Sequence, residues 1–129
     1  MSIKTANIPI ANATDQPVDL FRLQEMVGDD PHDLRDVVDL YMHEADDLML
    51  SLSEAVRAES LPEVQGLAHR LGGASAMCGM VGMIDPLARL ERAGETSERN
   101  EKEGWLKEAA RQKERIQAYL LDHGLRTAC

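Results

Sequence analysis

The most informative stretch of this sequence spans residues 68–79 and reads AHRLGGASAMCG. On an α-helix, at about 100° per residue, the apolar residues Val64, Ala68 and Leu71 fall on one face. His69 then points away from that face, toward solvent. Its neighbours three or four positions away, and one turn further on, are mostly small: they are Gln65, Gly66, Gly72, Gly73 and Ala76. The pattern predicts an exposed imidazole standing on a low platform.

Glycine is an unfavourable choice inside a helix, where each one costs about 1 kcal/mol relative to alanine. The three around His69 together cost on the order of 3 kcal/mol, against a typical folding stability of about 5–15 kcal/mol. A surface with only a structural role would carry Ala, Glu or Lys instead. We therefore interpret these small residues as an access platform, which lets another protein come within bonding distance of the imidazole: they are Gly66, Gly72, Gly73 and Ala76.

A lone exposed imidazole is suited to carrying a phosphoryl group. Its neutral form is abundant in the cytoplasm and is nucleophilic, so it can accept the group and later return it. The chain contains no glycine-rich phosphate loop and no Walker motif, so we expect no kinase activity of its own and a phosphoryl donor that is another protein. Arg70 is a candidate for stabilising the phosphoryl oxygens. Gln65 is a candidate for a hydrogen bond to the phosphoryl group or the ring.

Helices are predicted on both sides of this stretch. A short one is expected over residues 18–27, ended by Gly28, with four residues directed inward: Leu20, Phe21, Leu23 and Met26. A long helix should follow, with Asp30 as N-cap and Pro31 as its first residue. Its apolar positions recur at steps of three and four: they are Leu34, Val37, Val38, Tyr41, Ala45, Leu48, Leu52, Ala55 and Val56.

The helix that carries His69 is expected to start at a capping box formed by Ser60 and Glu63, and to end near Met77. The next segment, residues 80–93, contains Pro86. Either this proline bends the helix, or Asp85 caps a fresh start with Pro86 as the first helical residue.

After a polar connection over residues 94–100, a last helix is predicted for residues 101–123, ended by Gly124. Its expected inward residues are Leu106, Ala109, Ala110, Ile116 and Leu120. Four longer helices with short links favour an all-α fold, an antiparallel four-helix bundle with a short extra N-terminal helix. Residues 1–16 show no helical period and are expected to form a flexible arm, so the domain is predicted to span residues 17–129.

The composition narrows the possible functions. A chain of 129 residues is the usual size of one domain, and its aromatic content of 3% suits a helical core of aliphatic side chains. The net charge of -9 argues against nucleic acid and anionic membranes as partners. Two cysteines form no disulfide framework, no apolar run is long enough for a membrane span, and the N-terminus lacks the features of a signal peptide. We expect a cytoplasmic protein.

The stretch around His69 resembles the motif of the histidine phosphotransfer (HPt) domain family, which is roughly His-x-Leu-Lys-Gly-small-small followed by a further glycine. The matching positions are His69, Leu71, Gly73, Ala74, Ser75 and Gly79. The resemblance extends from about residue 18, through the Gly-Asp-Asp at Gly28 and the long second helix, to Leu90-Glu91. The family's lysine, three residues after the histidine, is Gly72 here, and Arg70 is the candidate substitute.

This resemblance implies a four-helix bundle that acts in a two-component phosphorelay. Such a phosphoprotein would accept a phosphoryl group on His69 from a receiver-domain aspartate and pass it to another receiver. Response-regulator receiver domains and a hybrid histidine kinase are the implied partners. Magnesium belongs to the receiver, so no cofactor is expected for this chain, and one exposed site per bundle implies a monomer.

Other interpretations of the same residues remain. His69 could be an ordinary surface histidine on a glycine-rich helix that packs closely against a neighbour. A degenerate HPt-like bundle could act only as a protein-interaction module. A di-iron bundle would require Glu three residues before its histidines, and none of the four histidines has one, so no metal is expected. The docking surface around His69 could include Met77 and Met80, although methionines at helical spacing also suit a core.

Overall fold

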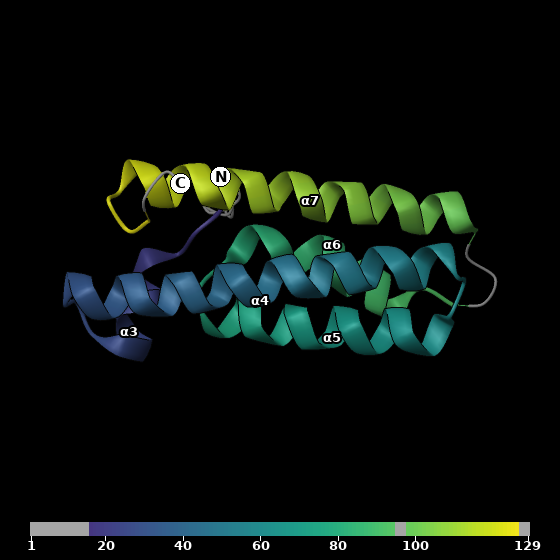
Figure 1. Cartoon of the computed structure of the whole chain (residues 1–129), viewed down its shortest axis with the longest axis horizontal. Helices are drawn as coiled ribbons and strands as arrows, with labels where there is room; N and C mark the ends of the chain where they lie inside the picture. The colour runs from purple at the N-terminus through teal and green to yellow at the C-terminus, as the bar shows by residue number, and fades with distance from the viewer. Residues whose placement is uncertain (1–15, 95–97, 127–129) are drawn as a thin grey trace, which may run out of the picture.

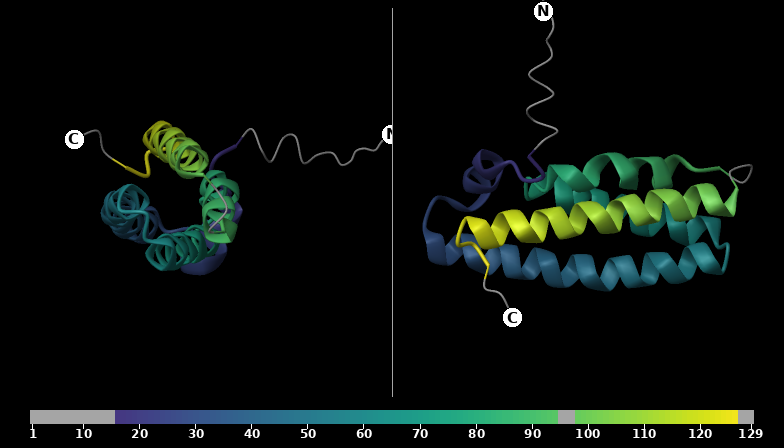
Figure 2. Two further views of the ribbon diagram at one scale, coloured as in Figure 1. Left: turned by 90° about the vertical axis from the view of Figure 1, so that its right-hand side faces the viewer. Right: turned by 90° about the horizontal axis from the view of Figure 1, so that it is seen from above.

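Helices account for nearly all of the regular structure in this computed structural model, which describes residues 16–94 and 98–126. They are α3 (Leu20–Val27), α4 (Pro31–Arg57), α5 (Leu61–Met77), α6 (Ile84–Arg92) and α7 (Arg99–Asp122), with the 3₁₀ turn η1 (Val81–Met83) before α6. Helices α4 to α7 lie side by side and α3 lies at one end (Figures 1 and 2). No strand occurs in the described ranges. The all-α prediction is confirmed, and the arrangement is compatible with the expected antiparallel bundle.

Local capping explains where several helices begin. The Asp30 side chain accepts hydrogen bonds from the backbone N–H groups of His32 and Asp33, and Pro31 is the first residue of α4, as predicted. Ser60 is the N-cap of α5, but its hydroxyl donates to Glu63 Oε1 at 3.2 Å and accepts no backbone N–H. The predicted capping box is therefore present only in part.

Pro86 neither bends a helix nor begins one. It is the third residue of α6, which starts at Ile84 after η1, and Met83 rather than Asp85 is the N-cap. The first turn of a helix leaves its backbone N–H groups without intrahelical partners, so a proline there removes no hydrogen bond. Asp85 lies in the same turn, where the helix dipole favours a carboxylate.

The core runs along the inner faces of all the helices. The predicted apolar positions of α4 are buried, except that Val37 is half-buried. Three predictions of inward residues are wrong: Phe21 is 69% exposed, and Met26 and Ala110 are also exposed. Helix α3 has only eight residues and buries Leu23 alone, so its opposite side remains in solvent.

Backbone hydrogen bonds join the extended segment before α3 to the turn that follows α5. The Asp19 N–H donates to the Gly79 carbonyl at 2.7 Å, and the Gly82 N–H donates to the Pro17 carbonyl at 3.0 Å. Gly79 has φ +77°, and a Cβ there would lie 2.5 Å from the Asp19 carbonyl oxygen, so only glycine fits. These contacts fix α3 against the C-terminal end of α5. The predicted flexible arm lies outside the described residues, apart from the exposed Gln16.

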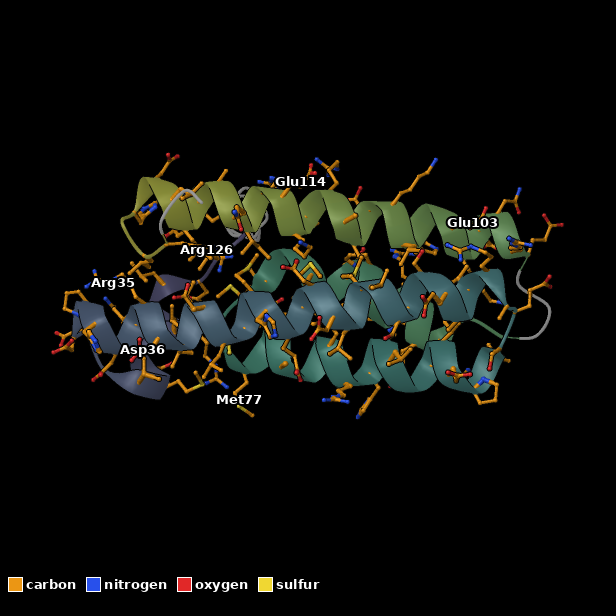
Figure 3. The ribbon with its side chains drawn as sticks, viewed as in Figure 1. Arg35, Asp36, Met77, Glu103, Glu114 and Arg126 are labelled. Carbon is orange, nitrogen blue, oxygen red and sulfur yellow. The ribbon has the colours of Figure 1, made fainter. Side chains whose placement is uncertain are left out.

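Two ion pairs join α4 to α7 on the side of the bundle away from α5 and α6. Lys113 pairs with Asp46, and Arg126, just beyond the end of α7, pairs with Asp39. Figure 3 shows Arg126 between the end of α7 and α4. The acidic side chains of α4 are therefore solvated or paired across its exposed edges rather than gathered into a site.

Candidate functional site

His69 lies on the solvent-facing side of α5, and its side chain is 76% exposed. Its Nδ1 is 2.7 Å from Oε2 of Glu91, which comes from α6. An ionised carboxylate can only accept a hydrogen bond, so Nδ1 carries the proton and donates it. The lone pair of the neutral ring is then on Nε2. The contact between two helices thus selects one tautomer and one orientation of the imidazole.

Sequence reasoning did not assign a role to Glu91. The residue enters the sequence pattern only as part of the Leu90-Glu91 pair that resembles the family motif. Its position does carry a signal, because Leu87 and Leu90 are buried and Glu91 follows them at the edge of the same helix face. Which residue of α5 it would meet depends on the packing of the two helices.

The platform around His69 is open at most of its positions. A Cβ added at Gly66 or Gly73 would meet nothing within 4 Å, and Ala76 is exposed. Gly72 differs, because it is half-buried and its added Cβ would lie 3.8 Å from the Cβ of Leu87 on α6. The small residues therefore leave the outer side of His69 unobstructed, while Gly72 lies at the seam between α5 and α6.

The two proposed supporting side chains point elsewhere in this structure. Arg70 Nη2 donates to Glu44 Oε2 at 3.3 Å, on the α4 side of α5. Gln65 Nε2 donates to the Ala93 carbonyl at 3.0 Å and so satisfies an acceptor at the end of α6. The structure brings Glu91 to His69, and it brings neither Arg70 nor Gln65 to the ring. A role for these two residues at the phosphoryl group stays a prediction.

A buried polar contact lies beneath the platform. Ser75 Oγ donates to the Leu71 carbonyl at 2.7 Å, which uses its single proton, so the Tyr41 hydroxyl donates to Ser75 Oγ, also at 2.7 Å. Burial raises the pKa of Tyr41 far above its ordinary value, and burial also raises the pKa of the nearby Cys78 thiol. This contact ties α5 to α4 directly behind the exposed site.

Several apolar side chains are exposed on α5, on α6 and on α3, which lies at the C-terminal end of α5. Met77, at the end of α5, is 58% exposed and points away from the bundle (Figure 3). Phe21 of α3 and Ile84 of α6 are also exposed. Met80 is fully buried, so its predicted place in a docking surface is wrong. Exposed apolar side chains of this kind are typical of a surface that binds another protein.

The site is a surface and not a pocket. A cavity of about 750 Å³ lies between the start of α3, the start of α6 and α7, where Gln112 and Tyr119 are among its lining residues, but His69 is not one of them. Within residues 16–94 and 98–126, no group of three or more His, Cys, Asp and Glu side chains is placed to hold a metal ion. No helix in those ranges is long and apolar enough to cross a membrane.

The fold and the site together define a class of small helical bundle with an exposed histidine that is oriented by a carboxylate of the neighbouring helix. The sequence model of the Hpt domain family matches residues 36–122. The chain belongs to this family. Hpt domains are histidine phosphotransfer modules of two-component phosphorelays, and they carry phosphoryl groups without kinase activity of their own. Their general partners are receiver domains and histidine kinases. A search of curated proteins gave no match to this chain.

Proposed function

We propose that Nε2 of His69 accepts a phosphoryl group from the aspartyl phosphate of one receiver domain and passes it to the aspartate of another. The observation that carries this proposal is the hydrogen bond between Nδ1 and Glu91, because it leaves the lone pair on the exposed nitrogen. A hybrid histidine kinase is proposed as the source of the phosphoryl group upstream of the first receiver.

The transfer needs no cofactor from this chain. The Nε2 lone pair attacks phosphorus, the bond from phosphorus to the aspartate oxygen breaks, and the carboxylate of the donor leaves. The ring then carries positive charge, which the Glu91 carboxylate stabilises through Nδ1. The reverse steps deliver the phosphoryl group to the next receiver. Magnesium is proposed to belong to the receiver.

The receiver is proposed to dock on the open part of the platform, Gly66, Gly73 and Ala76, with Met77 and Phe21 as apolar contacts toward the C-terminal end of α5. Small residues let the aspartate of the receiver reach the ring, while the exposed apolar side chains supply area that gains from burial. One site on one bundle requires no symmetry, so we propose a cytoplasmic monomer.

The test is transfer from a phosphorylated receiver domain to the full chain. We expect wild type to gain an acid-labile, base-stable phosphate, and His69→Gln to gain none while its Tm stays within a few degrees, because the side chain is exposed. His43→Gln is the matched control, since His43 is also highly exposed, on α4.

Two outcomes would contradict the proposal. Labelling of the His69→Gln variant would place the phosphoryl group on another residue. Binding of the receiver with no label on wild type would favour the alternative, a bundle that acts only as an interaction module.

A further inference from the structure

The Glu91 carboxylate meets His69 near the end of a short helix. Helix α6 has nine residues and ends at Arg92, one residue after Glu91. Leu90 is the last residue of α6 whose side chain is buried, and the Glu91 side chain beyond it is 41% exposed. Short helices are marginal by themselves, and the ends of helices open most readily. Burial up to Leu90 therefore leaves the position of Glu91 weakly fixed.

Gln65 supplies a contact on the other side of Glu91. Its side-chain Nε2 donates a hydrogen bond to the Ala93 carbonyl at 3.0 Å. Ala93 is the C-cap of α6, with φ -61° and ψ 130°, so the chain leaves the helix there. Carbonyl groups at the end of a helix lack partners within that helix, and this one takes its partner from α5. The backbone of Glu91 thus lies between a buried leucine and a carbonyl that is held by α5.

Gln65 and His69 lie four residues apart on α5 and therefore share one face of that helix. Each donates one hydrogen bond to α6 or its C-cap, and the two acceptors, Glu91 and Ala93, are two residues apart. The contact of Gln65 holds the backbone, whereas the contact of His69 uses the side chain of Glu91. The first contact therefore limits how far the partner of the imidazole can move.

We propose that Gln65 is a positioning residue for His69. By holding the Ala93 carbonyl, it keeps the end of α6 against α5, so that the Glu91 carboxylate stays within hydrogen-bond distance of Nδ1 and the lone pair stays on Nε2. Gln65 then acts on transfer through Glu91 and not through contact with the phosphoryl group. The effect on transfer rests on the proposed function of His69, whereas the effect on the ring does not.

The state of the imidazole is measurable without any phosphoryl donor. Nitrogen NMR shifts of the His69 ring in the full chain, at a pH where the ring is neutral, report which nitrogen carries the proton. We expect the proton on Nδ1 in wild type, and a larger share of it on Nε2 in Gln65→Met. Methionine is an unbranched helix former that cannot donate to the Ala93 carbonyl. Gln117→Met, which replaces a half-buried glutamine on α7, is the matched control and should leave the shifts unchanged.

Transfer from a phosphorylated receiver tests the route by which Gln65 acts. A hydrogen bond between neutral groups contributes less than one to a charged group, so we expect Gln65→Met to slow transfer to His69 about threefold to tenfold. In the Glu91→Ala background the same substitution should change the rate less than about twofold, because the effects of residues that act through one contact are not additive. Gln117→Met should leave the rate unchanged in both backgrounds.

An unchanged proton position in Gln65→Met would overturn the proposal, because Glu91 would then be fixed without the contact to Ala93. An equal loss of rate in the wild-type and Glu91→Ala backgrounds would also overturn it, and would assign Gln65 a direct role at the phosphoryl group. If wild type accepts no phosphoryl group on His69, the proposed function fails, and the NMR shifts of the ring still decide whether Gln65 positions Glu91.

Discussion

His69 and Glu91 show how a single contact between helices gives an exposed histidine one tautomer and one orientation. The sequence predicts the exposure of His69, because the helical period and the neighbouring glycines are local features. The partner of its Nδ1 could not be predicted, because His69 and Glu91 lie on different helices and their meeting depends on how α5 and α6 pack. The same limit applies to Arg70 and Gln65, whose partners Glu44 and Ala93 come from other parts of the bundle.

Replacing Glu91 tests the importance of this contact. A hydrogen bond to a charged group contributes about 1.5–3 kcal/mol, so Glu91→Ala should slow transfer to His69 roughly 10- to 100-fold. Glu91→Gln should lose less, since its amide oxygen can still accept from Nδ1. The measurement is the initial rate of transfer from a phosphorylated receiver, with Glu114→Ala on α7 as the control. Equal rates for wild type and Glu91→Ala would show that transfer to His69 does not depend on the hydrogen bond between its Nδ1 and the Glu91 carboxylate.

The ends of the helices were predicted where they depend on neighbouring residues in the sequence, and were not predicted where they depend on contacts between distant segments. Asp30 and Pro31 mark the start of α4, and Gly28 and Gly124 end α3 and α7 as expected, because capping depends on adjacent residues. The start of α6 was not predicted, because η1 forms only where residues 79–82 meet the segment before α3. The exposure of Phe21 was not predicted either, because it depends on the absence of a neighbouring element on one side of α3.

The glycines of the α5 region should separate into two kinds when replaced by alanine. Gly66→Ala should raise the free energy of unfolding by about 0.8–1 kcal/mol, because its Cβ enters open space on a helix. Gly79→Ala should lower it by more than about 1–2 kcal/mol, because φ is positive and the Cβ would collide with the Asp19 carbonyl. Urea unfolding followed by far-UV circular dichroism measures both. A destabilised Gly66→Ala would mean that Gly66 packs against something and does not serve access.

For the whole molecule, the prediction of an all-α fold rested on composition and on helical periods that span the chain, and the structure agrees. The helices share one continuous hydrophobic core. A bundle with one core is expected to unfold in a single cooperative step. Proton uptake at any one residue should then appear in the stability of the entire bundle.

Glu108 makes the free energy of unfolding depend on pH over a defined acidic range. Hydrogen bonds from Arg111 and then Gln112 lower the pKa of Glu108 to about 2, whereas an unfolded Glu titrates at about 4.3. A lowered folded pKa means that the unfolded state binds the proton more readily, so this stabilisation is present above about pH 4.3 and is lost as the pH falls toward about 2. Glu108→Gln should flatten the fall in unfolding free energy across that window. Glu114→Gln, an exposed change on the same helix, should leave the slope as it is, and equal slopes in the two variants would contradict the shift.

The backbone hydrogen bonds between residues 17–19 and residues 79–82 affect the order in which the chain folds. They join segments far apart in sequence, so the long loop between them must close before these hydrogen bonds can form. The contacts between α4 and α5 and between α5 and α6 are more local and should form earlier. Helix α3 would then join last and leave first, so the surface that it forms at the C-terminal end of α5 would be completed only after the rest of the bundle has folded.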